Sequence, residues 1–130
     1  MKIRKIVAAL IFEHGELLML RRRLNPRDSN WSLPGGVVES DENLEEALEK
    51  RIKEELGLDV EALFNVGILR LKNRKRNSID EINLFFTKSN SGQIIKNEKV
   101  LEISWFNKKE MNYHEIIPGL KEILEKLRRK

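Results

Sequence analysis

The stretch from Gly35 to Leu58, GGVVESDENLEEALEKRIKEELGL, holds the residues best suited to chemistry. Two glycines precede a segment dense in acidic residues, and the adjacent Glu54 and Glu55 lie near its end. Carboxylates from one helical turn are the oxygen ligands that hard divalent cations prefer. Glycines allow the backbone to approach a ligand closely. The stretch therefore predicts a site for a metal ion beside phosphate groups.

A helix must position these acids, and its two ends are marked in the sequence. Asn43 is a favourable N-cap with Glu46 three residues later, which is a capping-box pattern, and Gly57 is a favourable stop. Residues that share one apolar arc at helical spacing are Leu44, Ala47, Leu48, Ile52 and Leu56. The pattern predicts an amphipathic helix whose apolar arc packs on a sheet.

Charged residues also fall on or beside this apolar arc. Arg51 and Glu55 project from within it, and Glu54 lies at its edge. A buried carboxylate is costly unless a cation pairs with it, so both glutamates require a metal ion or a basic side chain. Arg51 precedes Glu54 by three residues and Glu55 by four, and it is a candidate partner for both.

The remaining elements predict one domain, residues 1–130, with an α+β fold. Strands are expected at residues 3–12, 17–20, 60–71, 80–88 and 100–106, and residues 31–38 are expected to form a close turn around Pro34, Gly35 and Gly36. A second helix is expected to begin near Pro118 and to cover the sheet with Leu120, Ile123, Leu124 and Leu127. The order strands, helix, strands, helix predicts a mixed β-sheet sandwiched between α-helices.

Composition excludes several classes of site. The chain has no cysteine, which rules out disulfides, thiolate zinc sites and cysteine nucleophiles and suits a reducing compartment. Its apolar runs are far shorter than the roughly 20 residues of a membrane span. We therefore expect a cytoplasmic protein with no membrane partner.

The net charge of +4 is unevenly distributed. Eight acids lie between Glu39 and Glu55, and basic residues gather at positions 21–27, 72–76 and 126–130. This arrangement suits a metal ion beside polyanionic phosphates, although a charged surface is the simpler reading of the C-terminal cluster. Nucleic-acid binding is not expected, because no aromatic residue alternates with the basic run at 72–76.

The stretch from Gly35 to Leu58 resembles the Nudix box, Gx5Ex7REUxEExGU, where U is a bulky aliphatic residue. The residues that match it at the required spacing are Gly36, Glu42, Ile52, Glu54, Glu55, Gly57 and Leu58. Residues 31–35 and 103–106 also resemble segments that flank the box in this family. The resemblance implies the Nudix fold, and it implies hydrolysis of a phosphoanhydride bond in a nucleotide derivative with Mg²⁺ or Mn²⁺.

The resemblance also implies roles for individual residues. Metal ligands would be Gly36, Glu54 and Glu55, with Glu39 contributing through its backbone, and the catalytic carboxylates would be Glu54, Glu55, Glu98 and Glu102. Glu98 and Glu102 are candidates for a general base outside the box, but each alone is more simply a surface glutamate. Independently of the resemblance, the basic cluster of Arg21, Arg22, Arg23 and Arg27 offers candidate phosphate contacts, and Gly35 and Gly36 let the backbone approach the substrate.

Two residues depart from the pattern. Lys50 and Arg51 stand where the family has Arg and Glu, and Arg51 reverses the charge at a position that serves as a metal ligand or base. Two hypotheses follow: an active hydrolase, or a catalytically impaired Nudix-fold module that binds a nucleotide or a partner. Subfamily marks for ADP-ribose, dinucleoside polyphosphates and coenzyme A are missing, which leaves a nucleoside triphosphate or a similar nucleotide. The family also allows a homodimer.

Overall fold

The computed structural model describes residues 2–23, 31–107 and 125. Its elements are β1 (Lys2–Glu13), β2 (Glu16–Arg22), β3 (Gly35–Val37), α1 (Leu44–Leu56), β4 (Asp59–Asn73), β5 (Ser78–Ser91) and β6 (Val100–Phe106). Each predicted strand is present, and β3 is an additional short strand inside the predicted turn. The residues on which the second helix was predicted lie outside the described residues.

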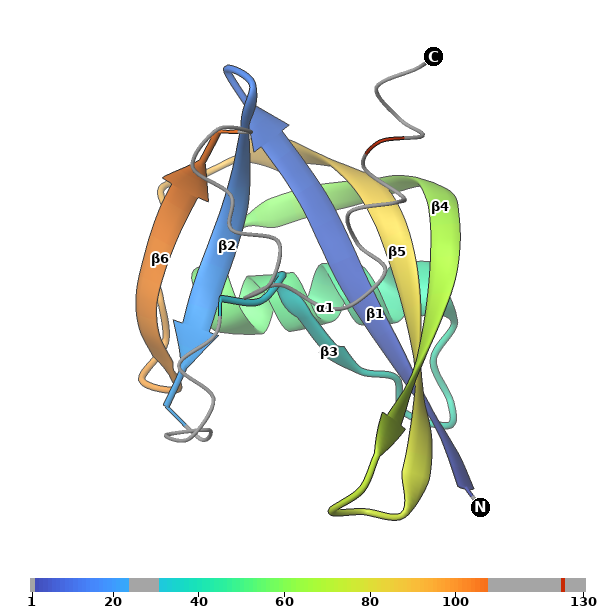
Figure 1. The fold of residues 1–130 in the computed structure, drawn as a ribbon. Coiled ribbons are helices and arrows are strands. Elements are labelled where there is room, and N and C mark those ends of the chain that lie inside the picture. The colour runs from blue at the N-terminus through green and yellow to red at the C-terminus, as the bar shows by residue number, and fades with distance from the viewer. Residues whose placement is uncertain (1, 24–30, 108–124, 126–130) are drawn as a thin grey trace.

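The strands form one sheet in the order β4-β5-β1-β2-β6, with β3 paired to β1. β1 runs parallel to β5, whereas the β1–β2, β1–β3, β2–β6 and β4–β5 pairs are antiparallel. The predicted mixed sheet is therefore confirmed. Figure 1 shows α1 lying across one face of this sheet, behind β1 and β5.

The continuous apolar run in β1 is explained by burial on both faces of the sheet. Val7, Ala9 and Ile11 pack in the same core cluster as the apolar arc of α1. Ala8 and Leu10 point to the opposite face and pack in a second cluster with Trp31 and Phe106 at its edge. Successive side chains of a strand point to opposite faces, so a run without alternation is required here.

The ends of α1 are those that the sequence predicts. Asn43 Oδ1 accepts a hydrogen bond from Glu46 N at 2.8 Å. Gly57 takes the left-handed conformation, with φ of 69°, and its N–H donates to the Lys53 carbonyl. Ala47, Leu48, Ile52 and Leu56 are buried, as expected of the predicted apolar arc. Neither α1 nor any other helix of the described residues is long and apolar enough to cross a membrane.

Candidate metal and phosphate site

The turn before β3 is fastened to β1 and so brings Gly35 to the end of α1. Ala9 N donates to the Pro34 carbonyl at 2.9 Å, and Gly35 pairs with Ala8 in the β1–β3 ladder. A Cβ on Gly35 would lie 2.0 Å from the Val7 carbonyl oxygen, and its φ is +149°. Residue 35 must therefore be glycine for the chain to pass this close to β1.

Glu55, in the last turn of α1, is bound by an arginine from β2. Arg22 Nε donates to Glu55 Oε2 at 2.7 Å, and Arg22 Nη2 donates to Glu55 Oε1 at 3.0 Å. Gly35 N donates to the same Oε1 at 3.2 Å. The side chain of Glu55 is 14% exposed. Bidentate guanidinium–carboxylate pairs of this kind are strong and orientationally specific. We call these residues, Arg22, Gly35 and Glu55, the Arg22 cluster.

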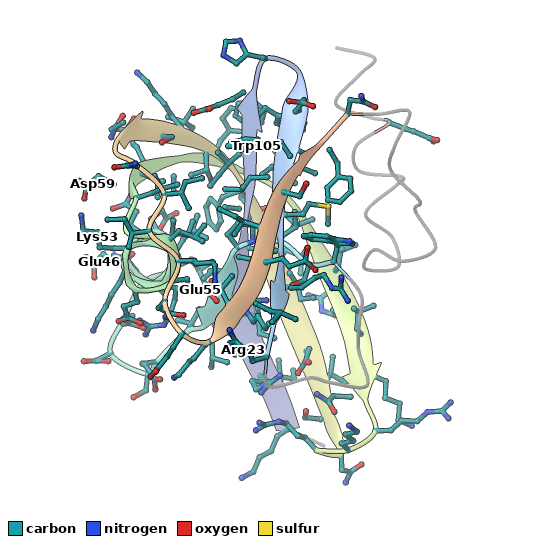
Figure 2. The ribbon with its side chains drawn as sticks, turned by 90° about the vertical axis from the view of Figure 1, so that its left-hand side faces the viewer. Arg23, Glu46, Lys53, Glu55, Asp59 and Trp105 are labelled. Carbon is teal, nitrogen blue, oxygen red and sulfur yellow. The ribbon has the colours of Figure 1, made fainter. Side chains whose placement is uncertain are left out.

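The rest of the Arg22 guanidinium is directed at oxygen atoms of the preceding turn. Nη1 donates to Ser32 Oγ at 2.9 Å, and Nη2 also lies 3.2 Å from the carbonyl oxygens of Leu33 and Gly35. Figure 2 shows Glu55 pointing from α1 toward the strands, whereas Glu46 and Lys53 point away from them. Carboxylate, hydroxyl and carbonyl oxygens thus converge on one cationic group.

A second arginine, Arg51 of α1, binds two other glutamates. Its Nη2 donates to Glu42 Oε1 at 2.7 Å, its Nη1 donates to Glu54 Oε1 at 3.2 Å, and its Nε donates to the Val37 carbonyl at 3.1 Å. The side chains of Arg51 and Glu42 are 14% and 10% exposed, whereas that of Glu54 is 53% exposed. We call Glu42, Arg51 and Glu54 the Arg51 cluster.

Glu42 is held in its charged form. The backbone N–H of Glu39 donates to Glu42 Oε1 at 2.9 Å, and Lys50 Nζ lies 3.7 Å from Glu42 Oε2. The hydrogen bond from Glu39 is the largest cause that lowers the pKa of Glu42 below its ordinary value, and the charges of Arg51 and Lys50 lower it further. A carboxylate with a lowered pKa and this many donors is a poor proton acceptor.

The expected partnership of Arg51 is confirmed for Glu54 and is wrong for Glu55. Arg22 binds Glu55, and the sequence interpretation did not single out Arg22 among its neighbours. Strand alternation was the available signal: Leu18 and Leu20 face α1, and the next residue on that side is Arg22. Glu42 was recognised as part of the motif, but its role as the partner of Arg51 was missed.

The described residues offer a sparse set of oxygen donors to a divalent ion. Within residues 2–23, 31–107 and 125, no three His, Cys, Asp or Glu side chains gather closely enough to hold an ion. Glu54 and Glu55 offer adjacent carboxylates, and the Gly35 carbonyl is directed at the same guanidinium as Glu55. This set of oxygen donors suits Mg²⁺ or Mn²⁺ once the Arg22 guanidinium moves from Glu55 to another anion.

The two glycines of the turn differ in what they contact. Gly35 binds Glu55 and Arg22 through its backbone. Gly36, the predicted metal ligand, lies against the Arg51 stem, where an added Cβ would be 3.1 Å from Arg51 Cδ. The structure therefore brings Gly35, and not Gly36, into contact with Glu55.

The two candidate bases lie in different surroundings. Asn97 N donates to the Glu55 carbonyl at 2.9 Å, and Asn97 Nδ2 donates to the Glu54 carbonyl at 3.1 Å. These bonds fasten the segment that carries exposed Glu98 to the end of α1. Glu102 instead pairs with Arg21 at 2.6 Å.

Arg21 and Glu102 lie on the sheet face opposite α1. Arg21 Cζ is 5.4 Å from the ring centroid of Trp31, and Trp31 packs with the core cluster on that face. Arg23 follows β2, is exposed, and donates its N–H to the Lys99 carbonyl beside the start of β6. Arg27 lies outside the described residues.

Comparison with known proteins agrees with the sequence motif and the fold. A family model described as the NUDIX domain matches residues 2–127. An ADP-ribose pyrophosphatase from Methanocaldococcus jannaschii is 42% identical over 52 residues, which cover 40% of this chain and 31% of that protein. A MutT-like protein from Streptomyces ambofaciens is 30% identical over 107 residues, which cover 82% of this chain and 65% of that protein.

A solved structure extends the agreement to three dimensions. The MutT protein from Methanosarcina mazei Go1 superposes with a TM-score of 0.81 at 25% identity, covering 98% of this chain and 94% of that one. The chain spans less than two thirds of the length of the two curated relatives above.

Proposed function

Since the chain belongs to the Nudix family, we propose that it hydrolyses a phosphoanhydride bond in a nucleoside diphosphate, a nucleoside triphosphate or a derivative of one. Nudix hydrolases generally use divalent metal ions, and the ion proposed here is Mg²⁺ or Mn²⁺. The observation that carries the proposal is the convergence of Glu54 and Glu55 with the guanidinium groups of Arg22 and Arg51 at one end of α1.

Each group at this end of α1 has a role that its chemistry supports. Glu54 and Glu55 would hold the ion, which would neutralise phosphate charge and acidify the attacking water. Arg22 is a phosphate contact, because a guanidinium that binds a carboxylate bidentately binds a phosphate in the same way. Arg23, directly after Arg22, is exposed and adds a second positive charge at the end of β2.

A base outside the box is required, because Arg51 stands where the family has a glutamate. We assign this role to Glu98, whose neighbour Asn97 is bonded to the backbone of both Glu54 and Glu55. Glu102 is the weaker candidate, since it pairs with Arg21 on the opposite face of the sheet.

The alternative, a catalytically impaired module that binds a nucleotide or a partner, is favoured by one observation. Every carboxylate of the two clusters has a cationic partner, which leaves less charge to attract an ion. The hydrolase is better supported, because both adjacent glutamates are retained and the named relatives include a pyrophosphatase. A cytoplasmic location, a homodimer and the lack of nucleic-acid binding stay predictions.

The test is a hydrolysis assay over a panel of nucleoside di- and triphosphates and their derivatives, each with Mg²⁺ and with Mn²⁺. We expect turnover of at least one nucleotide and a loss of about 100-fold or more in kcat/KM for Glu55→Gln. Glu46→Gln is the matched control, since it makes the same change on the face of α1 that points away from the strands. Absence of turnover across the panel would contradict the hydrolase, and equal losses in both variants would contradict the role of Glu55.

A further inference from the structure

The Arg51 guanidinium occupies the place between two carboxylates that a metal ion could otherwise bridge. It joins Glu42 Oε1 at 2.7 Å to Glu54 Oε1 at 3.2 Å, and its third donor binds the Val37 carbonyl. One cation thus connects the loop before α1, the helix itself and β3. Two acidic side chains and a backbone carbonyl are also the donor types that a divalent ion takes.

Arg51 is held in this position more firmly than a surface ion pair. Its side chain is 14% exposed and that of Glu42 is 10% exposed. Its aliphatic stem packs on Gly36, where a Cβ would approach Arg51 Cδ to 3.1 Å. Because glycine has no side chain, Gly36 leaves space for the stem of Arg51. Guanidinium groups stay protonated in proteins, so the positive charge here is permanent.

The charges around Glu42 are balanced without any ion. Lys50 Nζ lies 3.7 Å from the second oxygen of Glu42, so the two carboxylates of the Arg51 cluster face two cationic side chains. A divalent ion entering between Glu42 and Glu54 would have to displace the guanidinium or lie beside it. Like charges at such short range repel strongly where water is partly excluded.

We propose that Arg51 is a resident cation that replaces a divalent ion between Glu42 and Glu54, so that the chain binds one ion fewer than it would with an acidic residue at position 51. This inference rests on the proposed function in placing an ion at Glu54 and Glu55. The Arg51 side chain then supplies the positive charge that an ion would supply, and it cannot dissociate from the protein as an ion can.

The experiment is a Mn²⁺ titration without nucleotide, with free Mn²⁺ followed by electron paramagnetic resonance. Arg51→Gln should bind Mn²⁺ about tenfold more tightly than the wild type. Arg51→Glu should bind one more ion per chain. Lys53→Gln and Lys53→Glu are the matched controls. They make the same charge changes on the outward side of α1 at a residue that is 56% exposed, and they should shift the Kd by less than about twofold because exposed charges are screened.

Two outcomes would overturn the inference. Equal effects of the substitutions at positions 51 and 53 on the Kd would mean that Arg51 acts only through net charge. Equal numbers of bound ions in wild type and Arg51→Glu would mean that Arg51 does not occupy the position of an ion. Circular dichroism and thermal unfolding establish that each variant is folded, and Arg51→Gln introduces no new negative charge if Arg51→Glu misfolds. The titration contains no substrate, so its result is independent of whether the nucleotide panel is hydrolysed.

Discussion

The Arg22 cluster and the Arg51 cluster neutralise carboxylates of the same site by different routes. Arg22 reaches Glu55 from β2, across 33 residues of sequence. Arg51 reaches Glu54 from the preceding turn of the same helix, and it reaches Glu42, which lies nine residues earlier in the chain. The first pair exists only when β2, the turn at Gly35 and α1 are assembled, whereas the carboxylate contacts of Arg51 need only the helix and the loop that leads into it.

This difference separates the two arginines by how far each contributes to the stability of the fold. Arg22 connects three segments, so its loss should lower the stability of the whole domain. Both carboxylates that Arg51 binds are close to it along the chain, and its contact with the sheet is one hydrogen bond to the Val37 carbonyl of β3. We therefore expect Arg51 to contribute less to assembling the sheet and the helix. We expect its main effect to be on the charge offered to an ion. The predictions that follow test this separation.

The largest effect is expected from the glycine on the Arg22 side. Gly35→Ala places a Cβ 2.0 Å from the Val7 carbonyl oxygen at a φ of +149°, and we expect it to lower the free energy of unfolding by about 3 kcal/mol. Gly36→Ala meets the flexible Arg51 side chain instead and should lower it by less than about 1 kcal/mol. Urea unfolding of both variants measures the difference, and similar losses would contradict the asymmetry between the clusters.

A smaller effect is expected from the arginines themselves. Arg22→Met should lower the free energy of unfolding by about 2–3 kcal/mol, because Glu55 is left mostly buried with the Gly35 N–H as its remaining donor among those described above. Arg51→Met should cost less, because Glu42 keeps the Glu39 N–H and Lys50. A double-mutant cycle of Arg22→Met with Glu55→Gln should show coupling. Additive losses would mean that the Arg22–Glu55 pair does not stabilise the fold.

The smallest effect is a pH dependence confined to the Arg51 cluster. The pKa of Glu42 is lowered from 4.5, so the folded protein favours the deprotonated carboxylate more than the unfolded chain does. The stability it contributes is present above pH 4.5 and is lost as the pH falls through the lowered pKa. The difference in unfolding free energy between wild type and Glu42→Gln should therefore be constant at neutral pH and shrink in acid. A difference that grows on acidification would contradict the assigned cause.

Much of the fold and part of the site could be predicted because the signals are local. Asn43, Glu46 and Gly57 mark the ends of α1 through contacts within one turn. The strands follow from apolar runs, and the motif from fixed spacings. Arg51 with Glu54 is an i,i+3 contact on a helix, so it too could be predicted.

Positions that depend on distant pairing could not be predicted in this way. The candidate base Glu102 is three residues from Lys99, whose carbonyl accepts a hydrogen bond from Arg23 N. The β2–β6 register nevertheless pairs Glu102 with Arg21, on the sheet face opposite α1. The register of this pair shifts between Arg21 and Arg22, and a one-residue shift exchanges the faces of a strand. Sequence spacing does not contain that information.

The sequence by itself determined the bounds of α1 and the position of the adjacent Glu54 and Glu55 near its end, because helix periodicity, caps and motif spacing act over a few residues. The tertiary structure decided which cation meets which carboxylate. Arg22 was assigned to Glu55 because the β1–β3 pairing at Gly35 and the packing of α1 on the sheet bring three distant segments within hydrogen-bonding distance. Arg51 was thereby left to Glu42 and Glu54, which lie close to it along the chain.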